Sequence, residues 1–365
     1  MLPRTALSRA PPPPSSEPPS SADKRTERRS TPEVASPPET WLTRYIRNNP
    51  GAQEVFFRVL GLMGYGSAKQ YAGRRAFIMY RDLCIPRADD EQAFWKDEMS
   101  FPPTFQSWFT ITNLHVWLLT VRLRALPPPH GTHYVQALID HFFLDIEDRI
   151  RAVLQPFEPG RLTPANLGFP YTSRTDFYTV ANADKISPFA RGRAPEGLVT
   201  RQMKIFKEQW AGMGMSFDLG LVRSDPELAA AVWRNMLGAR GARGIVYPED
   251  GSEQPYFRRT VNLAGGEMEK FDRVEKAGLA EEEARDDGSG VHDFAPADAY
   301  KYVAYPELME TMVEYMRAEV DRLAKIPDHV FIGAGKIGTE SDGMDEMVFG
   351  AIRRVGSSSS APPLV

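Results

Sequence analysis

The sequence has a single cysteine and no recognisable catalytic motif. Cys84 is the only cysteine among 365 residues, which excludes an internal disulfide framework and a thiolate cage around a metal ion. Neither a phosphate-binding loop nor the turn that presents a serine nucleophile occurs. The net charge of −4 argues against a chain that coats nucleic acid. These absences favour a protein that binds partners rather than an enzyme.

Two short signals for a cofactor or metal are weak. Residues 333–338 match the dinucleotide pattern G-x-G-x-x-G, but too little chain follows to complete a strand, helix and strand. We expect them to form a C-terminal loop that clasps the helices. Histidines and acids gather between 130 and 147, yet the Glu-x-x-His pairs of di-iron bundles are missing. The sequence therefore predicts no cofactor and no metal.

The first 40 residues lack the apolar side chains that a fold needs. They contain ten prolines, so residues 1–40 are expected to be a disordered tail. The opening ten residues carry two arginines and no acid, which weakly matches a mitochondrial transit segment. A plain disordered tail is the alternative.

The next segment, 41–90, is expected to form basic N-terminal helices. Between residues 41 and 87 there are eight Lys or Arg and only two acids. Arg74, Arg75 and Arg81 are candidates for contact with ribosomal RNA or anionic lipid. A solvated helix face is the alternative interpretation.

A helix without a polar face is predicted from Thr104, which can cap it, to about Leu126, where three prolines follow. No charged residue occurs from Phe101 to Val121. Such a helix is either the centre of a bundle or a membrane span. Gln106, Asn113 and His115 oppose burial in hydrocarbon and favour the bundle.

The following helix has one apolar stripe and one charged face, so it can pack on the central helix as an antiparallel hairpin. We expect Arg122 or Arg124 to pair with Asp140 near the turn. Asp145 is expected near the same seam, and Asp148 on the exposed face.

Further helices are expected around Met203 to Phe217, from the cap at Ser224 to Gly238, and from Pro306 to Pro327. Trp233 is predicted to anchor the core or a partner interface. Loop insertions are expected at 156–197 and 239–298, and a flexible tail at 339–365. The second insertion, with its acidic stretch 267–293, is expected to be disordered or a flexible excursion. The fold class is therefore all-α, with one helical bundle over 98–338.

Rare aromatic and charged residues occur in a distinctive order, from Trp108, Phe109, His115 and Trp117 to Trp233, Arg234 and Asn235. This order resembles the ubiquinol-cytochrome c chaperone family. Where many relatives have Tyr-Asp-Glu-Gly, this chain has Leu219 in place of the glutamate, so no role for an acid is carried over. The residues that carry the resemblance are Trp108, Phe109, His115, Trp117, Arg122, Arg124, Asp140, His141, Phe217, Asp218, Gly220, Trp233, Arg234 and Asn235.

The resemblance implies a non-enzymatic assembly factor for respiratory complex III, peripheral on the matrix face of the mitochondrial inner membrane. Its implied partners are a small assembly factor in a heterodimer, newly made cytochrome b, and the mitochondrial ribosome. A helical metal- or quinone-dependent enzyme and a membrane-spanning structural subunit are the alternatives.

Overall fold

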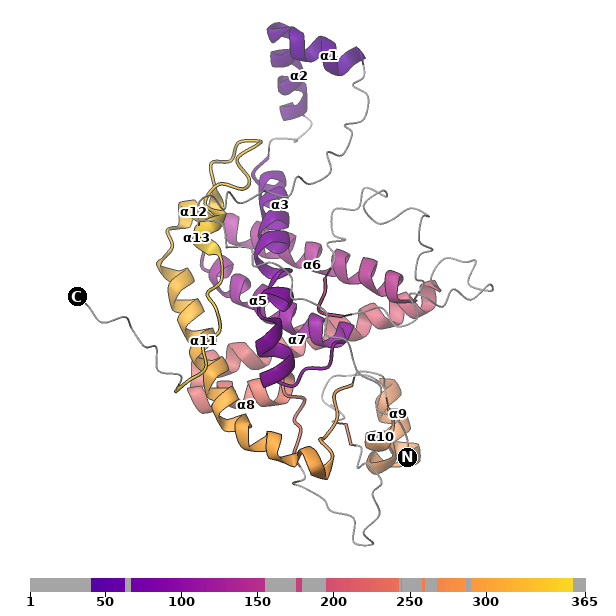
Figure 1. The fold of residues 1–365 in the computed structure, drawn as a ribbon. Coiled ribbons are helices and arrows are strands. Elements are labelled where there is room, and N and C mark those ends of the chain that lie inside the picture. Colours follow the sequence, from indigo (N-terminus) through magenta and orange to yellow (C-terminus); the bar gives the residue numbers. More distant parts are fainter. Residues whose placement is uncertain are drawn as a thin grey trace, which may run out of the picture. The chain divides into compact units, whose positions relative to one another are not determined.

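The computed structural model describes residues 41–62, 67–154, 175–178, 195–242, 244, 258–259, 268–286 and 290–356 (Figure 1). Every regular element among them is a helix, which confirms the all-α prediction. The expected tail 1–40 and most of the 156–197 insertion lie outside the described residues. The chain divides into two compact units, Met1–Val59 and Leu60–Val365, and the bundle belongs to the second.

The described part of the first unit contains α1 (Trp41–Asn48) and most of α2 (Pro50–Leu62), which runs past the boundary. Several large apolar side chains are exposed here. No described residue of 41–62 belongs to the buried core cluster. The exposed apolar residues are Trp41, Tyr45, Val55, Phe56 and Val59.

The second unit begins with α3 (Ala68–Met79), which is capped by the Ser67 hydroxyl. This helix continues without a break into the π-helical turn η1 (Tyr80–Cys84). Two short elements, α4 (Arg87–Asp90) and η2 (Phe94–Glu98), lead to the central helix. Cys84 is buried and free, and burial raises the pKa of its thiol.

The central helix, α5 (Phe105–Arg124), begins where the sequence predicts, because the Thr104 hydroxyl accepts a hydrogen bond from Ser107 N. It ends two residues before the predicted Leu126. Every side chain from Ser107 to Thr120 is buried, with α6, α7, α11 and η1 packed around it. The prediction of a bundle centre is confirmed. Within the described part of the chain, no helix has the length and hydrophobicity of a membrane span.

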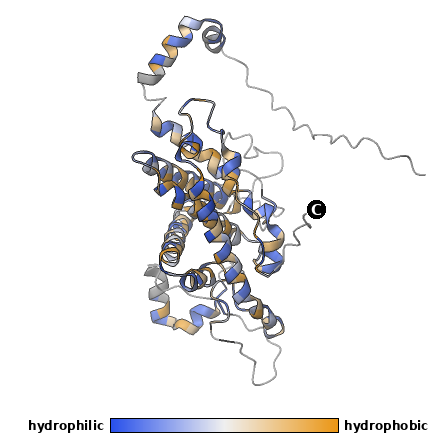
Figure 2. Ribbon diagram, turned by 90° about the vertical axis from the view of Figure 1, so that its left-hand side faces the viewer, coloured by the Kyte–Doolittle hydropathy of each residue, from blue (hydrophilic) through white to orange (hydrophobic). Residues whose placement is uncertain are grey.

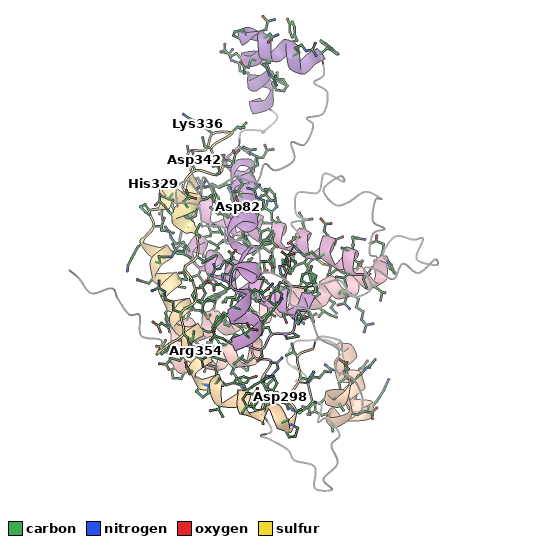
Figure 3. All side chains as sticks on the ribbon, viewed as in Figure 1. Asp82, Asp298, His329, Lys336, Asp342 and Arg354 are labelled. Carbon is green, nitrogen blue, oxygen red and sulfur yellow. The ribbon has the colours of Figure 1, made fainter. Side chains whose placement is uncertain are left out.

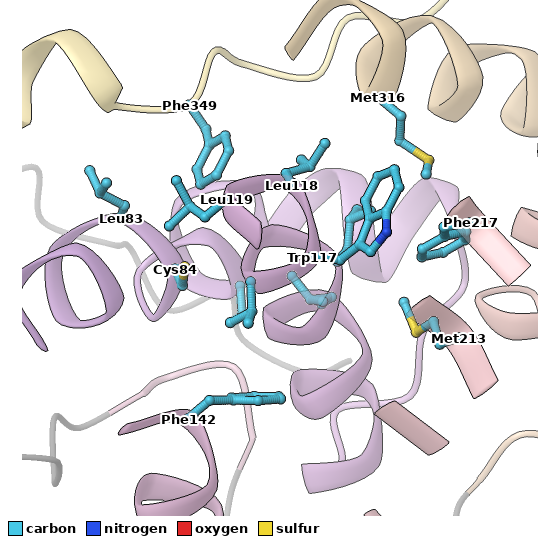
Figure 4. Packing of buried hydrophobic residues seen from close by; sticks show 14 of the residues in the cluster. Leu83, Cys84, Trp117, Leu118, Leu119, Phe142, Met213, Phe217, Met316 and Phe349 are labelled. Atoms are coloured by element: carbon cyan, nitrogen blue, oxygen red, sulfur yellow. The ribbon is translucent and has the colours of Figure 1, made fainter. Parts of the chain in front are cut away.

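Two further helices, α6 (His130–Leu154) and α7 (Glu196–Arg223), pack on α5, and α8 (Asp225–Asn235) packs on α7 and on a later helix of residues 305–325. The start of α8 is capped by the Ser224 hydroxyl, as predicted. Figure 4 shows Trp117 of α5 between Met316 and Phe217, with Met213 beneath Phe217. In Figure 2 the peripheral helices carry hydrophobic and hydrophilic residues side by side along their length, as amphipathic helices do.

The predicted disorder of the acidic 267–293 segment is wrong for its described residues. They form α9 (Met268–Ala277) and α10 (Leu279–Ala284). The acids have buried partners: Arg258 lies 2.6 Å from Asp293 and 3.4 Å from Glu283. Arg259 lies 2.6 Å from Glu282. A count of acids along the sequence omits these two arginines from the preceding loop.

The C-terminal part comprises η5 (Pro296–Ala304), α11 (Tyr305–Lys325), α12 (Asp328–Ile332) and α13 (Met344–Met347). The loop after α12 contacts α3 through the carbonyls of Thr339 and Glu340, whereas residues 334–338 of the predicted clasp are exposed. The predicted flexible tail 339–365 is wrong for residues 339–356. Their apolar side chains Met344, Met347, Phe349 and Ile352 are buried in the core.

Candidate interaction surfaces

Three residues of the sequence motifs meet at the junction of α5 and α7. Trp117 Nε1 donates to Asp218 Oδ1 at 2.9 Å, and the Arg124 guanidinium donates two bonds of 2.7 Å to the same carboxylate. Burial opposes ionisation of Asp218, but these hydrogen bonds outweigh it and lower the pKa of the carboxyl. Phe217 packs on Trp117 with ring centroids 5.2 Å apart. The cluster orients α7 on the central helix.

Gly220 is required by the close approach of α7 and α8. A Cβ at this position would lie 2.6 Å from Leu228 Cα and 2.8 Å from Leu228 N. Real side chains do not accept such contacts, so only glycine lets the two helices meet here. This residue has a packing role.

Trp108 covers a buried charged cluster between α5, α6 and η1. The Arg149 guanidinium lies 4.1 Å from the Trp108 ring centroid and donates to both oxygens of Asp145. Tyr80 donates its hydroxyl proton to Asp145 at 2.5 Å. Burial raises the pKa of Asp145, and Arg149 offsets part of that rise. Asp145 is thus buried beside the central helix, and its partner is Arg149 rather than Arg122 or Arg124.

The two motif histidines serve packing. His115 Nε2 lies 3.0 Å from the Tyr315 hydroxyl and Nδ1 lies 2.8 Å from Ile111 O. Burial lowers the pKa of His115 to about 3, so the ring stays neutral. His141 Nε2 lies 2.9 Å from Gly73 O, which joins α6 to α3. Among the described residues no cluster of three metal-binding side chains is found.

Phe109 sets the register of the α5 and α6 hairpin. Its ring stacks on Phe142 with centroids 5.7 Å apart, while a Cβ at Gly131 would lie 3.0 Å from Leu123 O. This antiparallel register places Asp140 alongside the middle of α5, several turns from Arg122.

The predicted pairing of Arg122 or Arg124 with Asp140 is therefore wrong. Arg122 instead donates to Asp328 and to the carbonyls of Leu323 and Ile326, at the end of α11. Arg124 is held by Asp218, and Asp140 is exposed. Asp148 is half-buried rather than exposed.

The three arginines predicted to contact RNA or lipid are placed differently from one another. Arg75 is completely buried and donates to the carbonyls of Phe331, Val330, Glu340 and Asp342. The prediction of a surface contact is wrong for this residue. Figure 3 labels Asp342 in the loop beside the start of α3.

Arg74 and Arg81 remain at the surface. Arg74 Nε lies 2.7 Å from Glu340 Oε1, and Arg81 is paired with the neighbouring Asp82. Both side chains keep about two fifths of their surface exposed, 38% and 44% respectively. Each of the two arginines is held in an ion pair. Glu340 in the first pair is largely buried, and Asp82 in the second is partly exposed.

Trp233 borders a shallow apolar groove between α8 and α11. Its Nε1 donates to Arg240 O at 3.1 Å, and its ring is half-buried. The groove has a volume of about 620 Å³, and Ala229, Ala230, Tyr302 and Met309 also line it. The half-buried tryptophan in an open groove fits the prediction of an anchor that serves both core and interface.

Arg234 and Asn235 follow Trp233 in α8, and their side chains contact other residues of this helix. Arg234 lies 3.4 Å from Glu227, and Asn235 Nδ2 donates to Ala231 O at 2.8 Å. The helix α11 contains three methionines. Met312 and Met316 are fully buried, and Met309 lines the groove.

A second apolar surface was not predicted from the sequence. On α7, Met215 and Val222 are 74% and 84% exposed, and Leu219 between them is 41% exposed. We call these three residues the α7 stripe. Their spacing of four and three is visible in the sequence and is typical of one helix face. It is hard to recognise there, because buried apolar residues such as Met213 and Phe217 alternate with these three along the same helix.

The α7 stripe flanks Asp218, whose partner Arg124 borders a depression of about 470 Å³ on α6. Val135 and Ile139 provide its apolar lining, and Asp140 lies at its edge. Exposed apolar residues next to a depression are typical of a surface that another chain covers.

The helices α5 to α10 coincide with a known family. Residues 97–156 and 192–284 match the family described as ubiquinol-cytochrome C chaperone. The second match continues through α9 and α10, so this stretch belongs to the family region rather than to an insertion.

Two curated relatives illustrate the similarity. Protein CBP3, mitochondrial, of Saccharomyces cerevisiae is 30% identical over 204 residues, which cover 56% of this chain and 45% of that protein. Ubiquinol-cytochrome c reductase complex assembly factor 1 of Homo sapiens is 25% identical over 191 residues, or 51% of this chain and 49% of that protein. The chain thus spans about half the length of these relatives. No solved structure matches. By these matches, residues 97–156 and 192–284 of the chain are similar to the ubiquinol-cytochrome c chaperone family.

Proposed function

We propose that this chain is an assembly chaperone for respiratory complex III, acting in mitochondria on the matrix face of the inner membrane. The family match and the names of its relatives support the assignment. The α7 stripe is the observation that carries it. Three neighbouring apolar side chains remain in water on a helix whose other face is well packed. Such a surface lowers its free energy when an apolar chain covers it.

The client is newly synthesised cytochrome b, an apolar membrane protein that needs shielding before insertion. Binding of this kind requires contact area and reversibility, and no chemical reaction. The motif residues support this interpretation, because their side chains join the helices of the bundle to one another.

A small assembly factor is the proposed partner in a heterodimer, and the Trp233 groove is its proposed seat. A half-buried tryptophan with small alanines around it is a common anchor for a partner helix. The basic residues of 41–87 are proposed to contact the mitochondrial ribosome. Arg44, Arg47 and Lys69 are exposed there, together with Arg74 and Arg81.

The first test of this function removes the protein. In cells that lack it, blue native electrophoresis should show loss of assembled complex III, while the other respiratory complexes remain. Restoration by the wild-type chain completes the test. Normal complex III in the absence of the protein would contradict the proposal.

The second test addresses the α7 stripe. Met215→Asp and Val222→Asp should each reduce the pulse-labelled cytochrome b that co-precipitates with the chain, since a charge in the contact is costly to desolvate. Leu198→Asp is the matched control, because Leu198 is an exposed leucine near the start of the same helix. If the two stripe variants recover as much cytochrome b as the Leu198→Asp control does, the stripe is ruled out as the client surface.

A further inference from the structure

Arg240 is a buried arginine with few partners among the described residues. It is only 4% exposed, and no carboxylate of the described residues forms a salt bridge with it. Its guanidinium donates to Ser100 O at 3.2 Å, and its Nε has no hydrogen-bond partner. By contrast, Arg149, Arg258 and Arg259 each bind a buried carboxylate. A buried charge without an anion is unfavourable.

The position of Arg240 is fixed by its backbone. It follows the turn that ends α8, where Gly238 and Ala239 both have positive φ, of 65° and 48°. Its carbonyl holds the Trp233 indole, and its guanidinium lies 4.8 Å from the Phe294 ring centroid. The unmet Nε donor is therefore held in place rather than free to turn to solvent.

Two lysines line the same depression as Arg240. The depression has a volume of about 440 Å³ and lies between η2, the 236–242 turn and the segment that leads into η5. Lys301 Nζ lies 5.1 Å from the centroid of the same Phe294 ring. Lys96 completes the cationic lining; Asp97 is the acid that lines the depression, and Asp298 lies 3.4 Å from Lys301 Nζ. Figure 3 labels Asp298, which marks this end of the molecule.

The repulsion among these cations and the unmet donor both call for an anion. A phosphate group suits the geometry, because arginine supplies fixed N–H donors while lysines supply charge from flexible stems. Phe101, Pro102 and Phe294 give the depression apolar walls that strengthen the electrostatic attraction. We propose that the depression of Lys96, Arg240 and Lys301 binds a phosphate-bearing ligand.

The ligand can be a free phosphate ester or the head group of a phospholipid. Arg240 also borders the Trp233 groove on its other side, and Tyr302 and Tyr305 line that groove. The Tyr305 hydroxyl is buried without a hydrogen-bond partner. An apolar groove beside a phosphate site offers room for an acyl chain, so the experiment includes a lipid arm. The site is independent of the client surface on α7.

The test uses the purified full chain and two probes. Glycerol 3-phosphate is titrated calorimetrically, and vesicles of phosphatidylcholine with or without phosphatidic acid are assayed by flotation. Lys96→Gln and Lys301→Gln should each weaken binding about fivefold or more, as loss of one charge contact does. Lys325→Gln, at an exposed lysine of α11, is the control and should bind as wild type does.

Arg240→Gln should abolish binding, and its far-UV circular dichroism establishes whether it folds. If that variant does not fold, the two lysine variants decide the question. Binding of glycerol 3-phosphate assigns a free phosphate ester. Binding of phosphatidic acid vesicles alone, lost in the lysine variants, assigns a lipid head group. Absence of binding by both probes, or binding that the lysine variants leave unchanged, overturns the proposal.

Discussion

At the scale of the residue, Gly220 shows how little space separates α7 from α8. Gly220→Ala should lower the free energy of unfolding by about 1 to 3 kcal/mol, because the new methyl group would meet the Leu228 backbone. Gly212→Ala on the same helix is the control. Nothing lies within 4 Å of a Cβ there, so it should be neutral or stabilising by up to about 1 kcal/mol. Urea denaturation measures both, and equal effects would show that the helices do not meet at Gly220.

Asp148 gives the molecule a pH-dependent weakness. Burial, with the charges of Asp145 and Glu147, raises its pKa to about 6. Between an unfolded pKa of about 4 and this folded value, the folded state retains a proton that the unfolded state has lost. Stability therefore falls as pH rises through this range.

Asp148→Asn removes that penalty. The variant should gain over wild type at pH 7 and little at pH 4, with a gain of at most about 1 kcal/mol since half of the side chain is in water. Thermal melting at the two pH values measures it, with the exposed Asp140→Asn as control. A gain that is the same at both pH values would contradict the raised pKa.

Burial of individual residues was predictable where the surrounding sequence is uniformly uncharged and apolar. Trp108, Phe109 and Trp117 lie in a stretch without charges, and all three are buried. Arg75 has the opposite outcome. Its neighbours suggest a basic surface, and the carbonyls that bury it come from residues about 255 to 267 positions away. Local sequence carries no signal for such partners.

At the scale of the element, the charge pairs between helices distinguish the observed register of the α5 and α6 hairpin from the register predicted from the sequence. Arg124→Ala and Asp218→Ala should be non-additive in a double-mutant cycle, with a coupling of about 0.5 to 1 kcal/mol for a half-exposed bidentate pair. Arg122→Ala and Asp140→Ala should be additive, because they do not meet. Urea denaturation of the variants measures both cycles. Coupling between Arg122 and Asp140 would reject the register set by Phe109 and Phe142.

Trp233 tests whether α8 is mainly a core helix or an interface helix. Its replacement by Ala would cost about 3 to 5 kcal/mol at a fully buried site, but its half-buried position lowers the expected loss to roughly 1 to 3 kcal/mol. Leu228→Ala on the same helix is fully buried and should cost more. Melting curves rank the two. Only the Trp233 change should weaken binding of the small partner. Intact binding by the Trp233→Ala variant would show that the partner does not bind in the groove.

Element boundaries with a side-chain cap were predictable, as Thr104 and Ser224 show. The register between helices was not, because it depends on which aromatic rings stack, and several stackings satisfy the same apolar stripe. The α9 and α10 pair was missed for a related reason. Its acids are neutralised by Arg258 and Arg259, which lie in a stretch without periodicity.

At the scale of the whole molecule, the proposed ribosome contact of Arg74 and Arg81 needs a test that leaves the core undisturbed. The Arg74→Gln and Arg81→Gln double variant should melt near wild type, because both side chains are partly exposed. It should sediment less with mitochondrial ribosomes at low salt, and the wild-type association should weaken as salt rises. Arg75→Gln alone should instead lower stability by several kcal/mol, since four carbonyls lose their donor. Ribosome binding that neither salt nor the double variant affects would reject the contact.

The hydrogen bonds of Arg75 also determine when the bundle can close during synthesis of the chain. The arginine is made more than 250 residues before the carbonyls that receive it. At roughly 5 to 20 residues per second, translation leaves an interval of about 13 to 50 seconds in which α3 has no means of burying this charge. The bundle can close only after the 330–342 segment has left the ribosome. A chain interrupted before that segment would hold an unsatisfied guanidinium at its first core helix, so incomplete products would remain open and recognisable to proteases.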